Sequence, residues 1–231
     1  RFLREARILS RLADPLICQV YDLIESEEAD LLVLEFVDGE TLDQLSSARK
    51  LAEREILEGI ELLASTEGVH AVEARIAAEP ALELVVNNAG FGSSGLFAEL
   101  DRDVEEEEVR LNVLALLRLT HAAVSVFKAR GHGSVINVSS LAGFQPSPFN
   151  ATYAATKAFV NSFTQAVSEE LRGSGVRLQL LCPGFTRTEF QDVAGVSTER
   201  IPDFAWMTPE AVVDASLDAL RKGELLVIPG G

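Results

Sequence analysis

The sequence is poor in side chains that bind metals. Among 231 residues it has two cysteines and three histidines. Cys18 and Cys182 lie far apart inside apolar runs, and the histidines, His70, His121 and His132, form no cluster with them. We therefore expect no zinc or other metal site. Scarce cysteine is typical of a reducing compartment, which predicts a cytoplasmic protein.

Positive charge is also scarce. The chain has 20 Lys and Arg against 36 Asp and Glu, a net charge of −16, and no Lys/Arg run. Nucleic-acid binding needs a basic surface, so we expect no nucleic-acid partner. We expect no membrane partner either, because no apolar stretch approaches the length of a membrane span and the N-terminus reads as a charged helix, not a signal peptide.

Both ends of the sequence look truncated. Arg1 stands inside a helical pattern, and 229–231 directly follow an apolar run.

Residues 1–64 combine helical and β-rich stretches. Apolar side chains repeat at helical spacing in three segments, at 1–12, 41–49 and 52–64. Two β-rich runs, 17–24 and 31–37, are separated by a polar stretch, which indicates an antiparallel β-hairpin.

From Ser65 onward, strands alternate with helices. Ser65 can cap a helix that runs to about Ala78, where Pro80 stops it. The predicted strands are 82–87, 134–139, 176–182 and 224–229, and the predicted helices are 103–130, 151–173 and 209–222. Strands that are apolar on both faces and joined by helices form a parallel sheet covered on both sides. The fold class is therefore α/β: a partial Rossmann-like parallel sheet flanked by helices, preceded by a helix and a hairpin.

Two polar features stand out in the long helix 103–130. The acidic run Glu105–Glu108 opens the helix, where negative charge meets the positive end of the helix dipole, and we expect it to form a solvated first turn. Asn112 interrupts the apolar run VRLNVLALL at a position where asparagine is disfavoured. A buried asparagine needs partners, so we expect Asn112 to bind a water or the backbone.

Tyr153 and Lys157 form a candidate acid/base pair. Four residues apart on a helix, they share one face. An ammonium beside a phenol favours the phenolate and lowers the phenol pKa, so that the hydroxyl can exchange a proton with a substrate oxygen. Alone, this spacing is a weak signal, because such pairs often decorate a helix surface.

Other polar and small residues end the predicted strands, where parallel sheets place their active sites. Ser140 follows the second strand, thirteen residues before Tyr153, and a loop with Gly and Pro can fold it back toward the tyrosine. Its hydroxyl could polarise a carbonyl oxygen. Asn87–Gly90 ends the first strand, and Cys182-Pro183-Gly184 closes the third, followed by Thr188.

Together these motifs resemble the short-chain dehydrogenase/reductase family over residues 65–231. The strand-end motif NNAG stands at Asn87–Gly90 and PGxxxT at Pro183, Gly184 and Thr188. The resemblance implies that Asn112, Ser140, Tyr153 and Lys157 are catalytic. It also implies that the cofactor, NAD or NADP, is bound by Asn88, Ala89, Gly90, Tyr153, Lys157, Pro183, Gly184 and Thr188.

The same resemblance implies an oxidoreductase that moves hydride between a nicotinamide and a small-molecule carbonyl or alcohol. Tyr153 would exchange the proton, Ser140 would orient the oxygen, and Lys157 would hold the ribose. Asn112 would anchor the water of a proton relay. Residues 185–207 fall at the substrate lid, whose aromatic residues, Phe190, Phe204 and Trp206, suggest a hydrophobic substrate. A homo-oligomer is a further expectation.

The glycine-rich turn of the family, TGxxxGxG, has no counterpart upstream of NNAG. The upstream glycines, Gly39, Gly59 and Gly68, lack its spacing. Members of the family often place an acidic residue near the adenine, and in this sequence the corresponding stretch, 62–65, contains no acidic residue. The pyrophosphate therefore lacks its usual backbone amides, and the choice between NAD and NADP is not readable.

Residues 1–64 instead resemble part of a bacterial serine/threonine protein kinase. The stretch 1–12 resembles its αC helix, with Glu5 at the ion-pair position, and 17–42 resembles two strands and the hinge. Its lysine, glycine loop, HRD and DFG motifs are all missing, so phosphoryl transfer is not expected. The chain thus resembles a chimera joined near residue 64. The hairpin 17–37 or the N-terminal helices would then cover the inner edge of strand 82–87.

Three functions remain open from the sequence. The first is an oxidoreductase, favoured by Asn112, Ser140, Tyr153 and Lys157. The second is a catalytically silent binding or scaffold module, favoured by the missing phosphate loop. The third is a kinase-related protein.

Overall fold

The computed structural model of this protein describes residues 22–25, 30–34, 63–188 and 201–230. The helices expected at 1–12 and 41–49, and nearly all of the one at 52–64, lie outside these residues. Glu5 of the kinase-like αC stretch also lies outside them.

A six-stranded sheet runs through the described part of the chain in the order β1-β2-β3-β4-β5-β8. Its parallel core is formed by β3 (Leu82–Asn87), β4 (Gly133–Val138), β5 (Val176–Leu181) and β8 (Leu226–Val227). This arrangement confirms the α/β fold with a parallel sheet. The last strand is shorter than the predicted 224–229, since β8 covers only two of these residues.

A β-hairpin covers the inner edge of β3. In it, β1 (Asp22–Glu25) pairs antiparallel with β2 (Asp30–Leu34), and β2 then pairs parallel with β3, with Val33 opposite Val86. The hairpin was one of the two covers expected for this edge, and the sheet order confirms it. An unpaired parallel strand would expose a row of backbone donors and acceptors.

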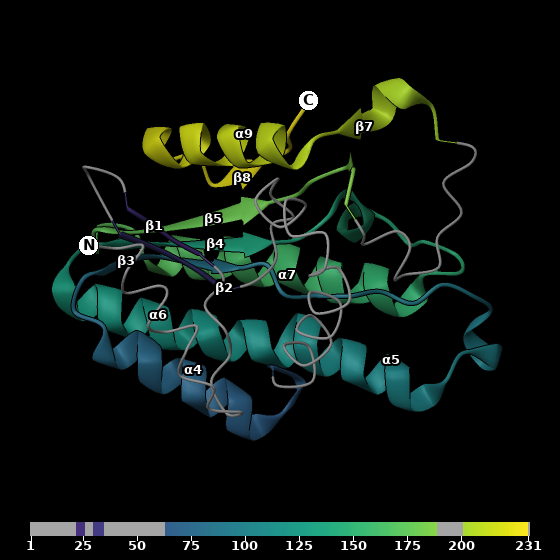
Figure 1. The fold of residues 1–231 in the computed structure, drawn as a ribbon, viewed down its shortest axis with the longest axis horizontal. Helices are drawn as coiled ribbons and strands as arrows, with labels where there is room; N and C mark the ends of the chain where they lie inside the picture. The colour runs from purple at the N-terminus through teal and green to yellow at the C-terminus, as the bar shows by residue number, and fades with distance from the viewer. Residues whose placement is uncertain (1–21, 26–29, 35–62, 189–200, 231) are drawn as a thin grey trace, which may run out of the picture.

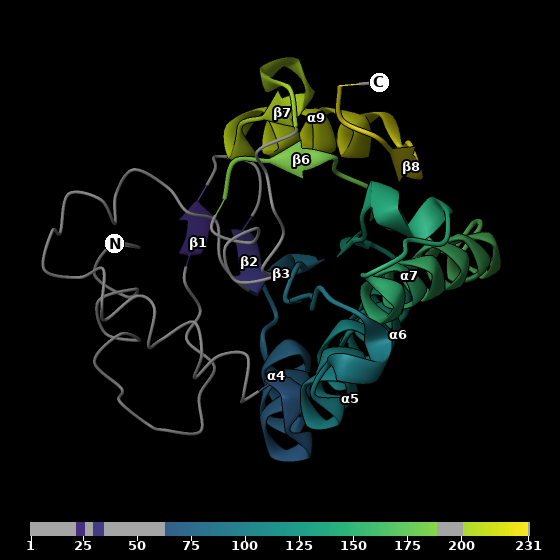
Figure 2. The same cartoon turned by 90° about the vertical axis from the view of Figure 1, so that its right-hand side faces the viewer.

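Helices cover both faces of the sheet (Figures 1 and 2). One face carries α4 (Thr66–Ala78), α6 (Leu116–Arg130) and α7 (Ala151–Glu170), with α5 (Arg102–Val109) leading into α6. The other carries α9 (Pro209–Lys222). The larger core lies under α4 and α6, where Ile76, Ala123 and Phe127 meet Val85 and Val135 of the sheet.

Local sequence signals set the helix ends. The Ser65 hydroxyl accepts a hydrogen bond from Gly68 N at 3.0 Å and caps α4, as predicted. Thr208 caps α9 in the same way through Ala211 N, with Pro209 at the first helical position, where its missing N–H costs nothing.

The predicted helix 103–130 is continuous in direction but changes its hydrogen bonding midway. Between α5 and α6, residues Arg110–Ala115 form a π-helical segment, η2. Within the described residues, this stretch, Arg102–Arg130, is long and apolar enough to span a membrane by length and composition, which corrects the expectation that no such stretch exists. Its buried Leu111, Leu119 and Phe127 pack in the core beside the sheet, while Val109, Leu114 and Leu117 are exposed.

Candidate active site

The carboxyl ends of β3, β4 and β5 lie side by side at one edge of the sheet. Ser139 N donates to Leu181 O at 2.7 Å, and Leu141 N donates to Pro183 O at 3.0 Å. The segment that carries Ser140 is therefore tied to the segment that carries Pro183 and Gly184. Parallel sheets bind ligands at this end of their strands.

Helix α7 presents Tyr153 and Lys157 to this edge, one turn apart. The Lys157 Nζ lies 5.7 Å from the centroid of the Tyr153 ring. The Lys157 side chain is only 5% exposed, and its Nζ donates to the Val138 carbonyl at 3.0 Å, at the end of β4. The two side chains share one face, as the four-residue spacing predicts.

The Tyr153 side chain is hydrogen-bonded to that of Ser140, which brings the predicted serine and tyrosine together. The Ser140 hydroxyl also accepts from Ala142 N at 3.1 Å, so it caps the short helix η3 (Leu141–Phe144). Its position is therefore held both by the backbone and by the phenol.

The acidity of Tyr153 differs from the sequence-based expectation. Burial raises the pKa of its phenol to about 12, the Ser140 hydrogen bond works in the opposite direction, and the Glu108 carboxylate raises it further. The prediction that this pKa lies below its ordinary value is therefore wrong: the pKa is raised, because burial disfavours the charged phenolate. The phenol is thus protonated at neutral pH.

Asn112 lies in the π-helical segment and is 1% exposed. Its Oδ1 accepts from Phe91 N at 3.2 Å, and its Nδ2 donates to Phe91 O at 2.8 Å and to the Thr156 hydroxyl at 3.2 Å. The expected link from this asparagine to the backbone is confirmed. It joins the loop after β3 to α7, and π segments of this kind are frequent at functional sites.

Gly90 lies where the predicted cofactor and catalytic residues meet. A β-carbon at this position would stand 2.8 Å from Asn112 Oδ1 and 3.5 Å from Lys157 Nζ. Asn88 and Ala89 precede it, half-buried, at the end of β3. Only a glycine leaves the backbone this close to the lysine and the asparagine.

Thr188 stands in the segment that follows β5. It follows the two-residue strand β6 (Phe185–Thr186), which pairs with β7 (Trp206–Met207), and its N–H donates to Thr186 O at 2.9 Å. Phe190 of the expected lid lies outside the described residues.

Comparison with known proteins decides the family. The sequence profile described as short chain dehydrogenase matches residues 35–196 of this chain. The chain belongs to the short chain dehydrogenase family. The match begins at residue 35, inside the segment that resembles a kinase.

Several members of the family are similar in sequence or structure. A 7beta-hydroxysteroid dehydrogenase of Collinsella aerofaciens is 36% identical over 141 residues, 60% of this chain and 53% of its own length. The ketoacyl reductase HetN of Nostoc sp. is 31% identical over 156 residues, 64% of this chain and 51% of its own length. The structure of a short-chain dehydrogenase from Sphingobium yanoikuyae in complex with NADPH matches with a TM-score of 0.70 and 31% identity, over 86% of this chain and 78% of that one. The chain spans about half the length of the curated relatives it matches.

Asn87, the first residue of the short chain dehydrogenase motif NNAG, is structural in this chain. Its Nδ2 donates to the Thr120 hydroxyl at 3.0 Å and to Asn137 Oδ1 at 2.8 Å. Asn137 in turn donates to the Thr164 hydroxyl at 3.0 Å. These buried bonds tie β3 and β4 to α6 and α7 and so hold the site's two helices in place.

Glu105 and Glu108 are site residues that the sequence analysis missed. The prediction that the run Glu105–Glu108 forms a solvated turn is wrong for these two, since Glu105 is buried and Glu108 is 0% exposed. Glu108 Oε2 accepts from Ser93 N at 3.0 Å, and Glu105 is hydrogen-bonded to the hydroxyls of Ser93 and Thr152. The spacing could have indicated that these two residues are buried, because positions 105, 108 and 112 share one helix face.

Burial raises the pKa of the Glu108 carboxyl to about 7. The hydrogen bond from Ser93 and the Lys157 cation work against this rise, while the Glu105 carboxylate adds to it. Glu108 therefore changes its charge within the neutral range, beside the phenol of Tyr153.

Proposed function

We propose that this protein is an oxidoreductase that transfers hydride between a nicotinamide dinucleotide, NAD or NADP, and a small carbonyl or alcohol substrate. The observation that carries the proposal is the meeting of Ser140, Tyr153 and Lys157 at the carboxyl ends of β4 and β5. Relatives named as a hydroxysteroid dehydrogenase and a ketoacyl reductase, and a similar structure in complex with NADPH, support the class of reaction and of cofactor.

Each side chain then has a separate task. Tyr153 gives its phenolic proton to the carbonyl oxygen in reduction or takes one in oxidation, and the Ser140 hydroxyl orients that oxygen. Asn112 anchors a proton relay and holds the loop after β3. The dinucleotide, when bound, supplies or accepts the hydride.

The residues at the nicotinamide end fit such a cofactor. Lys157 would hold the ribose hydroxyls, and the close backbone approach at Gly90 makes room beside them. Asn88 and Ala89, Pro183 and Gly184 would line the ring, with Thr188 on its carboxamide.

The substrate that fits best is hydrophobic. Phe185 and Trp206 lie together on the β6–β7 segment, with ring centroids 5.6 Å apart. Phe204 beside them is 90% exposed, which leaves an apolar surface available to a ligand.

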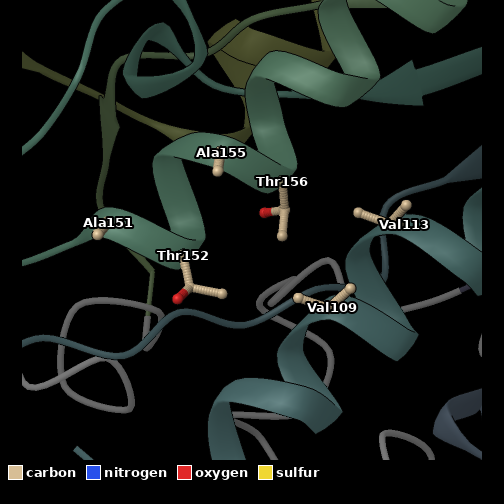
Figure 3. A pocket seen from close by; sticks show the side chains of 6 residues that line it. All are labelled: Val109, Val113, Ala151, Thr152, Ala155 and Thr156. Atoms are coloured by element: carbon tan, nitrogen blue, oxygen red, sulfur yellow. The ribbon is translucent and has the colours of Figure 1, made fainter. Parts of the chain in front are cut away.

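A homo-oligomer would use another surface. A shallow depression of about 390 Å³ lies between η2 and α7, on the face of α7 that carries Ala151 and Ala155 (Figure 3). Val109 and Val113 line its other side, and Leu114 nearby is exposed. Two copies of the chain that bury this apolar surface against each other would be stabilised as a dimer, which sedimentation or light scattering would measure.

A cytoplasmic location and the division near residue 64 into a kinase-like fragment and a reductase part remain predictions from the sequence.

Titration with NADH and NADPH, followed by the fluorescence of the reduced cofactor, tests the enzyme function. We expect saturable binding of one of the two and turnover of an apolar ketone. The lack of binding at millimolar cofactor would leave the silent binding module as the function of this chain.

A further inference from the structure

Glu108 and Asn112 hold the same loop from one helix face. Four residues apart across the junction of α5 and η2, they reach successive peptide groups of the segment after β3. Asn112 binds both the N–H and the carbonyl of Phe91, at 3.2 and 2.8 Å. Glu108 accepts from Ser93 N at 3.0 Å. The two side chains therefore hold both ends of the Phe91–Ser93 segment.

The other side of this loop faces α7. A β-carbon at Gly92 would stand 2.8 Å from Cδ2 of the Tyr153 ring. Asn150 Nδ2, at the start of α7, donates to Ser93 O at 2.9 Å. The loop is thus packed between the helix that carries Glu108 and the ring of the proposed proton donor.

The Glu108 carboxyl is buried without full compensation. Its side chain is 0% exposed, and its Oε1 has no hydrogen-bond partner among the described residues. The titratable groups that act on it are Glu105 from its own helix and Lys157 from α7, while Tyr153 of α7 is acted on by Glu108. The loop itself, 90–95, carries no charged side chain.

We infer that Glu108 is a positioning residue for Tyr153, and that it makes the proton donor sensitive to pH. Its carboxyl holds Ser93 and thereby keeps Gly92 against the phenol ring. Its negative charge, when the proton is lost, disfavours the Tyr153 phenolate. This role rests on the proposed function for its catalytic consequence, but the loop contact exists without it.

The hold on Ser93 and the charge effect on Tyr153 can be tested separately, because they depend on different properties of the Glu108 carboxyl. The hydrogen bond from Ser93 needs only an acceptor oxygen, which an amide also has. The effect on Tyr153 needs the charge, which an amide lacks. Glu108→Gln thus removes the charge and keeps the acceptor, and Glu108→Ala removes both. Glu107→Gln is the matched control. It removes one negative charge from the residue directly before Glu108, whose side chain is partly exposed.

Amide hydrogen exchange at Ser93 tests the positioning role without any need for turnover. In the full chain we expect Glu108→Ala to raise the exchange rate of this amide by about tenfold or more, and Glu108→Gln and Glu107→Gln to change it by less than about threefold. Unchanged Ser93 exchange in Glu108→Ala would overturn the positioning role. If Glu108→Ala does not fold, Glu108→Asp replaces it, because the shorter side chain draws the acceptor away from Ser93.

The pH dependence of alcohol oxidation tests the charge effect. We expect the midpoint of its alkaline rise to move to lower pH in Glu108→Gln, by about half a pH unit or more, and to stay in place in Glu107→Gln. Identical profiles for Glu108→Gln and the wild type would overturn this effect. If the wild type itself shows no turnover, the proposed function fails, and spectrophotometric titration of Tyr153 in a Tyr21→Phe background decides the charge effect instead.

Discussion

The backbone of Gly92 lies directly against the ring of Tyr153. A β-carbon at position 92 would stand 2.8 Å from Cδ2 and 3.1 Å from Cγ of that ring. The first distance is shorter than real β-carbon contacts and the second is tighter than most of them, so any side chain there must displace the phenol or the loop. The loop after β3 therefore packs against the Tyr153 ring and limits where the proposed proton donor can lie.

Gly92→Ala should lower activity without unfolding the protein. The added methyl group displaces the Tyr153 ring, and small misplacements of a reacting group reduce rates strongly. We expect kcat/KM for ketone reduction to fall by about tenfold to a hundredfold.

Gly95→Ala is the control for this change. Its β-carbon would meet Cδ2 of Leu100 at 2.9 Å, the flexible end of a side chain that can rotate away. Steady-state kinetics should give near wild-type values for it. Equal losses in the two variants would mean that the loop, not the ring contact, matters.

Tyr153→Phe removes the phenolic hydroxyl and keeps the ring that packs on Gly92. Loss of a general acid costs about a hundredfold to ten-thousandfold in rate, so turnover should nearly vanish. Cofactor affinity, measured by fluorescence titration, should change little, because Lys157 and its bond to Val138 stay in place. Retained turnover would contradict the role of Tyr153.

Asn112→Ala should destabilise the protein. The change leaves the N–H and the carbonyl of Phe91 without their partner in a buried site, which costs about 2–4 kcal/mol. Urea unfolding measures this loss. Leu114→Ala, in the same π segment but exposed, should change the free energy of unfolding by less than about 1 kcal/mol. A similar loss in both variants would show that Asn112 contributes only helix propensity.

The sequence predicts the parallel core well because its signals are local. The strand 82–87 is predicted to the residue, and the helix expected near 209–222 is found there as α9. Pro80 marks the end of α4 and the Thr208-Pro209 pair marks the start of α9, through backbone chemistry that needs no tertiary contact. The grouping of Ser140, Tyr153 and Lys157 also follows from local signals, since strand ends and one helix face define it.

The remaining features depend on contacts between distant segments. The π segment centres on Asn112, whose partner Phe91 lies 21 residues away. Glu108 is buried because the loop at Ser93 folds over it, and no helical pattern contains that loop. The high pKa of Tyr153 has the same origin, because burial rather than the nearby lysine dominates it.

The buried carboxyl of Glu108 should make stability depend on pH. Its pKa rises on folding from 4.5 to about 7, so the folded state holds this proton more tightly than the unfolded state does. The stabilisation is present at low pH and is lost as pH rises through the folded pKa. At about 1.4 kcal/mol per pKa unit, the loss is on the order of 3 kcal/mol.

Glu108→Gln removes this dependence, because an amide does not titrate. Urea unfolding between about pH 4.5 and 8 should show the wild type losing stability relative to Glu108→Gln as pH rises. Glu107→Gln should follow the wild type, since that side chain is only partly buried. Parallel stability curves for the wild type and Glu108→Gln would mean that Glu108 does not titrate in this range and that its charge is balanced in the folded protein, with Lys157 as the nearest cation acting on it.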